Sequence, residues 1–345
     1  MKLTHATLVL VATVMIAHEG RCQGQESLLF ELATDARSAA LGGAVMADLE
    51  SDVHGSGLNP CFLDTSIQGD ITIDYIDYFA GVGMTAVNYQ LLPKGKWNLQ
   101  VGARFMNLGT FSGYDAAGNT TQDFGGGDQM VYFGTSRAID SVWTLGIQGF
   151  IGSRHLNREV AGWLGAEAFL HARWKSKRIA TGLALTGAGY QWGLKGSQPT
   201  GSLPFNVQLA LTKGFKNAPF RIFLKAQNLQ TWDLAPPGTY DDTVDPITQE
   251  VTKNSTFKFG DQLMRHVTIG TAVSAGGSME IWLGFDYRRR TELMATDRLS
   301  GNGLSFGAQF EFGKFAMRIG RLRYHFAGAS THIGIRFNPR KFTRS

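Results

Sequence analysis

Apolar and polar residues alternate along most of the chain from Gly69 onward, in segments of about ten residues separated by turn signals. In one segment Trp97, Leu99 and Val101 share one parity, while Asn98 and Gln100 share the other. A period of two is the signature of a β-strand whose two faces meet different surroundings. The pattern therefore predicts an all-β chain.

The alternation predicts fourteen strands. They are expected at residues 69–79, 82–92, 96–107, 128–138, 141–152, 160–174, 178–189, 204–214, 218–228, 262–274, 279–288, 302–312, 314–323 and 327–338. An even number of strands is typical of single-chain outer-membrane barrels.

The connections between these strands alternate in length. Every turn after an even-numbered strand has at most four residues, whereas the loops at 109–127, 190–203, 229–261 and 289–301 are long. Outer-membrane barrels show this difference between their periplasmic turns and extracellular loops. A soluble β-sandwich or propeller also alternates apolar and polar residues, but it has no reason to keep the difference in length. We therefore predict a fourteen-stranded antiparallel transmembrane β-barrel over residues 69–338, with its apolar face toward lipid.

Composition excludes several other classes of protein. Only 18% of the residues are charged, 43% are apolar, and 43 residues are glycine. Beyond the extreme N-terminus no apolar run reaches the ~20 residues that a spanning helix needs, which excludes a polytopic helical membrane protein. The formal net charge of +5 is spread along the chain. It therefore indicates no nucleic-acid partner.

The first residues have the pattern of a secretory signal peptide. Lys2 precedes a twelve-residue apolar core at 6–17, which is too short to span a membrane. We place the signal peptide at 1–23, with cleavage between Gly20 and Gly24. Cys22 also raises the alternative of a lipoprotein, although Arg21 is a poor match for lipoprotein processing. The prediction implies export to the outer membrane of a Gram-negative bacterium.

Residues 24–68 show no alternation. A short helical turn is expected at 28–32, and residues 35–46 are rich in alanine and glycine. We expect this segment to plug the lumen, the alternative being a periplasmic arm. At the other end, residues 339–345 form a basic tail, expected in the periplasm, with Arg340, Lys341 and Arg344.

Several stretches resemble the PorV/PorQ family of FadL-like barrels, found in the type IX secretion system of Bacteroidetes. The first two are the sequence ARSAALGGA at 36–44 and Asn59-Pro60. Others are Tyr78-Phe79-Ala80-Gly81, Leu203-Pro204-Phe205, the run QNLQTWDL at 227–234, Met264-Arg265-His266, Tyr287-Arg288-Arg289-Arg290 and the run RYHFAG at 323–328. Cys61 departs from the family pattern, in which alanine usually follows Asn-Pro.

The resemblance implies membership of the attachment complex of that system. In this complex the barrel would hold the surface protein PorZ directly, beside PorU and PorV. The complex removes C-terminal signals from secreted cargo and fixes the cargo to anionic lipopolysaccharide. The resemblance also implies outer-membrane lipid and lipopolysaccharide as neighbours.

No catalytic motif is present, and we expect neither an enzyme nor a bound cofactor or metal. The chain has no Gly-x-Ser-x-Gly, His-Glu-x-x-His, phosphate-loop or Cys-x-x-Cys motif. His155, His325 and Asp241 could be imagined as a hydrolase site at the rim, but nothing in the sequence connects them.

Two groups of loop residues are candidates for binding. Trp232 and Tyr240 in the 229–261 loop, with Phe111 and Tyr114 in the 109–127 loop, are expected to contact a protein partner, because aromatic residues are favoured at interfaces. Alternatively, the 229–261 loop covers the lumen or is disordered. Arg288, Arg289 and Arg290 are expected to face lipopolysaccharide phosphates, with a solvated loop base as the alternative.

Two functions stay open. The first is a non-enzymatic anchor in the attachment complex. The second is a FadL-like channel for hydrophobic small molecules, which would need an apolar pocket and a plug that moves. The predicted lumen side carries polar residues such as Arg104, Gln148 and Glu280, which disfavour the channel.

Overall fold

The structure is a computed structural model that describes residues 28–92, 95–195, 200–244, 251–252, 257–292, 301–325 and 328–340. The predicted signal peptide lies outside these residues, as does most of the basic tail. No helix among the described residues is long and apolar enough to cross a membrane.

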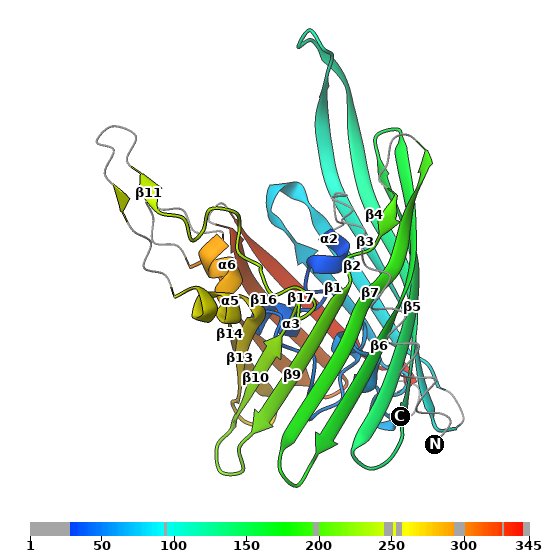
Figure 1. The fold of residues 1–345 in the computed structure, drawn as a ribbon. Helices are drawn as coiled ribbons and strands as arrows, with labels where there is room; N and C mark the ends of the chain where they lie inside the picture. The colour runs from blue at the N-terminus through cyan, green and yellow to red at the C-terminus, as the bar shows by residue number, and fades with distance from the viewer. Residues whose placement is uncertain are drawn as a thin grey trace, which may run out of the picture.

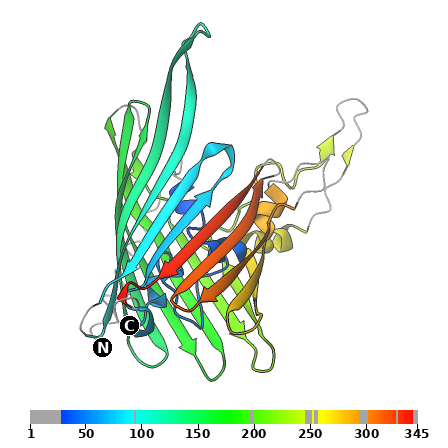
Figure 2. The same cartoon turned by 180° about the vertical axis from the view of Figure 1, so that it is seen from behind.

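Fourteen strands of the described chain form a closed antiparallel ring (Figure 1). In ring order they are β1 (Ile71–Asp77), β2 (Gly83–Gln90), β3 (Trp97–Tyr114), β4 (Thr120–Ala138), β5 (Trp143–Leu156), β6 (Glu159–Trp174), β7 (Ile179–Lys195), β9 (Asn206–Gly214), β10 (Phe220–Ala226), β13 (Val267–Ser274), β14 (Met279–Asp286), β15 (Leu304–Phe312), β16 (Phe315–His325) and β17 (Gly328–Phe337). β17 pairs with β1 and closes the ring (Figure 2). The predicted fourteen-stranded barrel is confirmed.

Short strands and helices lie outside the ring in the connections. β8 (Gly201–Ser202) pairs with β7, and β11 (Thr243–Val244) pairs with β12 (Val251–Thr252). η3 (Phe79–Gly81) joins β1 to β2. α5 (Lys258–His266) precedes β13, and α6 (Tyr287–Glu292) follows β14. We call the end of the barrel that carries these helices the mouth (Figure 1).

The outward face of the strands is apolar all round the ring. Large apolar side chains that are 44–56% exposed on this face include Ile73, Phe133, Ile147, Leu164, Leu209, Leu283, Phe306 and Ile335. Between them along the strands, the inward residues are buried and many are polar, such as Gln100 and Gln148. An apolar surface of this extent is unfavourable in water and favourable in contact with lipid acyl chains. The sequence pattern and the closed ring together define a membrane barrel.

Several predicted boundaries are wrong. β5 and β7 continue past their expected ends at 152 and 189, to Leu156 and Lys195. β3 and β4 continue well past Asn107 and pair up to Tyr114 and Thr120, so most of the expected 109–127 loop is a hairpin extension. The strand expected at 262–274 begins only at Val267, because α5 occupies the preceding residues. The strand expected at 279–288 ends at Asp286, where α6 begins.

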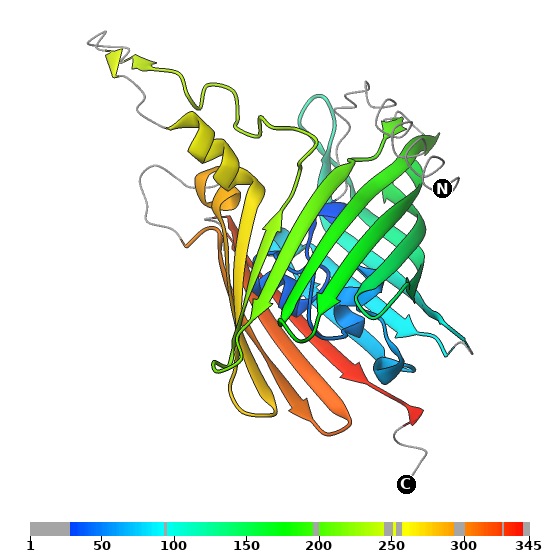
Figure 3. The same ribbon diagram turned by 60° about the horizontal axis from the view of Figure 1, so that its bottom comes forward.

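Residues 28–70 lie inside the ring of strands (Figure 3). The segment contains α2 (Leu28–Glu31), α3 (Ala36–Ala40), α4 (Val53–Ser56), η1 (Pro60–Phe62) and η2 (Thr65–Ile67). α3 contacts β14 to β17, α4 contacts β1, β2 and β17, and η1 contacts β4 to β6. The segment thus contacts strands far apart around the ring.

Candidate functional site

The lumen near the short-turn end holds a cluster of buried ion pairs between the N-terminal segment and the wall. We call these residues the ion cluster: Arg37, Asp48, Asp52, Arg221, Glu280 and Arg318. Arg37 Nη1 lies 2.5 Å from Asp48 Oδ2, and Arg318 Nη1 lies 2.9 Å from Asp52 Oδ2. Burial alone would raise the pKa of Asp52, but the guanidinium of Arg318 and the neighbouring charges hold it well below its usual range. Asp52 is therefore a buried carboxylate that needs its partners.

Polar side chains of the wall also satisfy the backbone of the segment. Hydrogen bonds are donated by Gln100 to the carbonyl of Ser56, by Arg104 to that of Gly57, by Thr212 to that of Ala47 and by Ser305 to that of Ala40. Their donor–acceptor distances run from 2.6 to 2.9 Å. A chain without regular ladders must find such partners when it is buried. The polar side chains that the alternation predicted on the lumen side therefore bind the N-terminal segment.

Glycines in the strands leave room for the segment. A Cβ at Gly320 would lie 2.3 Å from the carbonyl oxygen of Ala36, and one at Gly284 would lie 2.3 Å from the backbone nitrogen of Gly42. Side chains at these positions would push the backbone of α3 and its following turn away from the wall. The fit is thus close at the level of the backbone.

The mouth end of the lumen is held differently, by an apolar cluster. We call its members the mouth cluster: Leu29, Leu32, Ala33, Ala39, Ile76, Met84, Met106, Met130, Tyr132, Phe150, Trp163, Leu203 and Leu322. Phe30 of α2 packs on it with its ring 5.6 Å from that of Phe150 and 5.8 Å from that of Trp163. Sequence parity predicted a polar lumen, and at this end that expectation is incomplete.

Trp232 belongs to an exposed aromatic surface on the long connection between β10 and β13. Its ring lies 5.4 Å from that of Phe259, and Phe257 lies 6.3 Å from Phe259. We call Trp232, Phe257, Phe259 and Leu263 the loop patch, and these side chains are 45–74% exposed. The sequence predicted Trp232 as a contact residue but not the other three. Leu263 was assigned to the strand expected at 262–274, and Phe257 and Phe259 were left as ordinary residues of the long loop.

Tyr240 has a structural role that the sequence did not suggest. Its hydroxyl donates a hydrogen bond of 2.7 Å to Asp261, which also accepts one from Tyr287 at 2.7 Å and one from Arg265 at 2.7 Å. Partial burial by itself raises the pKa of Asp261, but the hydrogen bonds from Arg265 and the two tyrosines bring it below its usual value. Asp261 therefore joins the long connection, α5 and α6.

Phe111 and Tyr114 lie on the hairpin extension of β3, on another side of the mouth from the loop patch (Figure 1). Phe111 stacks on Phe124 of β4 at 5.4 Å, while Tyr114 is 64% exposed near the tip. The structure therefore does not bring the four predicted contact residues together as one surface.

Arg288, Arg289 and Arg290 lie on α6, not at the end of a strand. Arg288 pairs with Glu292 at 3.0 Å, and Arg289 pairs with Asp286 at 3.5 Å. Carboxylates within the chain thus take up part of the charge that was expected to face phosphates. Binding of lipopolysaccharide by these three arginines stays a prediction.

The described residues contain no group of three or more His, Cys, Asp and Glu side chains placed to hold a metal ion. Of the imagined hydrolase residues, His155 lies on β5 and Asp241 lies in the long connection. The side chain of His325 lies outside the described residues. No catalytic arrangement links His155 with Asp241 in the described part of the chain.

The fold and the filled lumen define a class, a closed membrane barrel with an internal N-terminal segment. No protein-family model matches the chain, and no curated protein matches its sequence. Among solved structures it is similar to the toluene transporter TodX of Pseudomonas putida, with 12% identity, 88% of this chain and 96% of that chain covered, and a TM-score of 0.47. The toluene transporter TbuX of Ralstonia pickettii has 12% identity, the same coverage and a TM-score of 0.46.

A FadL homologue of Pseudomonas aeruginosa has 9% identity, with 88% of this chain and 98% of that chain covered and a TM-score of 0.45.

Proposed function

We propose that this chain is a closed outer-membrane barrel that serves as a docking platform for a surface protein and does not act as an enzyme. The observation that carries the proposal is the fit between the N-terminal segment and the wall. Ion pairs, hydrogen bonds to backbone carbonyls and glycine contacts all fix residues 36–67 in the lumen. A solute could pass through the barrel only if these contacts were broken.

The loop patch supplies a surface for a partner. Its aromatic side chains are exposed and lie on α5 and the adjoining connection, which Asp261 ties to the barrel. Large aromatic side chains held on an ordered support are typical centres of protein interfaces. We expect the partner to bind at the mouth, on the side of β13 and β14.

The particular partner rests on the resemblance to the PorV/PorQ family. On that basis the chain would be the PorQ member, would hold PorZ directly and would work beside PorU and PorV in the type IX attachment complex. Its predicted signal peptide fits this location. Cargo would then be processed and attached at the surface next to the barrel.

Affinity purification of the tagged barrel from its own membranes, followed by mass spectrometry, tests the docking proposal. The Trp232→Ala and Phe259→Ala double variant should lose a large surface protein that the unaltered barrel retains. Phe312→Ala, an exposed aromatic residue at the short-turn end of β15, is the control and should retain it. Equal recovery of that protein with the double variant would refute docking at the loop patch.

A second candidate function is a channel for hydrophobic small molecules, and the mouth cluster favours it. Methionine and aromatic side chains line this end of the lumen, and α2 fills the space between them. An apolar solute could use such a surface if α2 moved away. Passage through the barrel would still require residues 36–67 to move.

A disulfide can test this requirement. A Cβ at Gly146 of β5 would lie 2.8 Å from Cys61 Sγ, so Gly146→Cys places two thiols within reach of each other. For a channel, cells carrying this variant should take up a radiolabelled medium-chain fatty acid when the thiols are reduced and not when they are oxidised. For a platform, uptake should equal that of cells without the barrel in both states.

A further inference from the structure

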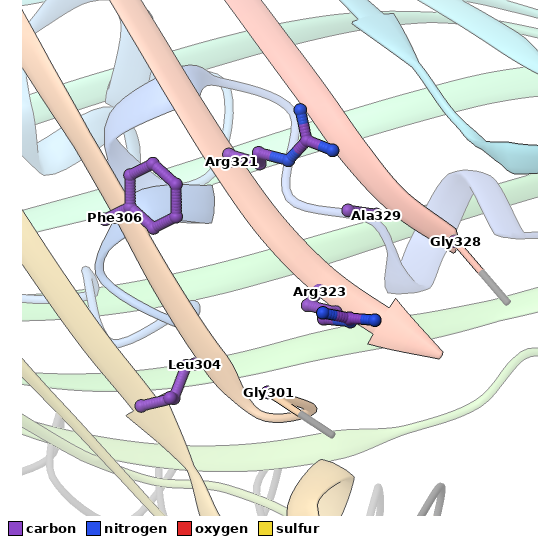
Figure 4. Close-up of a pocket in the computed structure, with 7 residues that line it drawn as sticks. All are labelled: Gly301, Leu304, Phe306, Arg321, Arg323, Gly328 and Ala329. Carbon is purple, nitrogen blue, oxygen red and sulfur yellow. The ribbon is translucent and has the colours of Figure 1, made fainter. Parts of the chain in front are cut away.

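A hollow lies on the outer surface of the barrel, where β15, β16 and β17 approach the mouth (Figure 4). It has a volume of about 450 Å³ and is lined by Leu304 and Phe306 of β15, Arg321 and Arg323 of β16, and Ala329 of β17. Cationic and large apolar side chains thus meet in one place on the membrane-facing wall. This site differs from the lumen and from the loop patch.

Both arginine side chains point away from the lumen. Leu322, which lies between them in β16, is fully buried, whereas Arg321 and Arg323 are exposed. Arg321 is opposite Phe306 on one side and Thr331 on the other. Because side chains alternate across a strand, the two guanidinium groups share the lipid-facing side of β16.

The two arginines lie at the mouth end of an apolar column on the outward face of β16. Below them the same outward face carries Ile319, Met317 and Phe315, which are 42–47% exposed. The six steps from Phe315 to Arg321 span roughly 20 Å along the strand at about 3.3 Å per residue. An apolar column that ends in two cations is what a lipid with a charged headgroup meets at the boundary of the hydrocarbon layer.

Neither arginine has an ion-pair partner among the residues that the structure describes. Their neighbour on the inward face, Arg318, is paired with Asp52 at 2.9 Å. Arg288 and Arg289 on α6 also have carboxylate partners. Arg321 and Arg323 thus present a double positive charge outward, beside apolar side chains that can hold an acyl chain.

We propose that this hollow binds a phosphorylated glycolipid of the outer leaflet. Its phosphate would accept hydrogen bonds from Arg321 and Arg323, since guanidinium groups bind phosphate through paired N–H donors. One acyl chain would lie along Leu304 and Phe306 toward the middle of the membrane. The site would give the barrel a fixed lipid neighbour on the β15–β17 side, whatever the function of its loops.

Native mass spectrometry of the purified barrel in detergent tests the proposal. Bisphosphorylated lipid A and the same lipid with its phosphates removed are titrated separately, with inorganic phosphate as a third arm. The Arg321→Ala and Arg323→Ala double variant should bind bisphosphorylated lipid A at least about tenfold more weakly, because two charge-assisted hydrogen-bonding groups are lost. The dephosphorylated lipid should bind the unaltered barrel as weakly as it binds the variant.

Arg137→Ala is the matched control, since Arg137 is an exposed arginine near the short-turn end that lies over Trp97 at 5.3 Å. It should bind bisphosphorylated lipid A like the unaltered barrel. The Arg321→Lys and Arg323→Lys variant keeps the charge and serves if the alanine variant does not fold. It should show weaker binding, because lysine lacks the paired donors.

Three results would overturn the proposal. The first is equal binding of phosphorylated and dephosphorylated lipid, which would indicate apolar contact alone. The second is full retention of binding by both double variants. The third is displacement of the lipid by inorganic phosphate at equal concentration, which would indicate a site for free phosphate.

Discussion

The two ends of the lumen hold the same N-terminal segment by different physical means. At the short-turn end the ion cluster pairs Arg37, Asp48 and Asp52 with charged wall residues. At the mouth end α2 packs on apolar side chains, methionines among them. Ion pairs with fixed partners specify one occupant, whereas apolar packing accepts any occupant of suitable size and shape. The difference indicates that the contacts at the short-turn end are specific for this segment, whereas those at the mouth end are less specific.

The largest expected effect comes from breaking the ion cluster. Arg318→Ala should lower the free energy of unfolding by about 3–5 kcal/mol, because it leaves the buried Asp52 carboxylate without its closest cation. The measurement is equilibrium unfolding of the refolded barrel in urea. Arg321→Ala, three residues along the same strand but facing outward, is the control and should change the free energy by less than about 0.5 kcal/mol.

If Arg318→Ala and Arg321→Ala lowered the free energy of unfolding equally, the ion cluster would not be a main source of stability. Asp52→Asn should also lower the free energy, since it leaves the buried Arg318 guanidinium without its carboxylate partner. Combining both substitutions should therefore be less than additive.

A smaller effect is expected at the mouth cluster. Leu29 is fully buried there, so Leu29→Ala should cost about 2–3 kcal/mol in the contacts of α2. The loss should appear as faster proteolysis of the N-terminal residues, with little change in global unfolding, because the ion cluster still holds residues 36–67. Leu194→Ala, at a site 60% exposed, is the control. If global unfolding moved as far as it does for Arg318→Ala, the two ends of the lumen would not be independent.

The reactivity of the Cys61 thiol reports whether the N-terminal segment leaves its position in the lumen. Burial raises the pKa of this thiol to about 12, so it is neutral and shielded at pH 8. A maleimide should label folded barrel at least about tenfold more slowly than urea-unfolded barrel, since the thiolate is the reactive form. Labelling should speed up in Arg318→Ala and stay slow in Leu29→Ala. Rapid labelling of the unaltered barrel would show that the segment is loosely held throughout.

Much of the barrel could be predicted from the sequence, and the reason is periodicity. Each strand separates lipid from lumen, so one parity must be apolar, and the number of strands in the ring followed from counting such segments. The register of the hairpin extension beyond Asn107 could not be predicted, because both faces there meet water and the alternation fades. The helix α5 was missed for a similar reason, since Phe257, Phe259 and Leu263 are exposed and mark no buried face.

The contacts of the lumen were only half predictable. The alternation along the strands predicted that Arg104 and Glu280 face the lumen. It could not predict their partners, because the N-terminal segment shows no alternation. The segment carries Asp48, Glu50 and Asp52, and the alternation along β16 places Arg318 on the lumen side, where it can pair with them. The mouth cluster could not be predicted from the alternation, because Met106 and Met130 occupy the same alternate positions as the polar lumen residues.

The smallest effect is expected outside the lumen, where ion pairs and hydrogen bonds hold the loops. Asp261→Asn should weaken the packing of α5 by about 1 kcal/mol, since it removes the charge that accepts bonds from Arg265 and two tyrosines. The folded pKa of Asp261 lies below its ordinary value, so its contribution is present above that value and is lost as the pH falls through the lower, folded pKa. Limited proteolysis of the long connection at pH 7 and near pH 3 measures this effect.

Leu263→Ala is the control for α5, because it removes exposed apolar surface and leaves Asp261 intact. Proteolysis of the unaltered barrel should increase on acidification, while that of Asp261→Asn should already be raised at pH 7 and change little. If Asp261→Asn opened the connection no more than Leu263→Ala, the loop patch would lack its support. The ordered docking surface would then have to be sought on the hairpin extension of β3 and β4, whose stacking of Phe111 on Phe124 involves no titratable group.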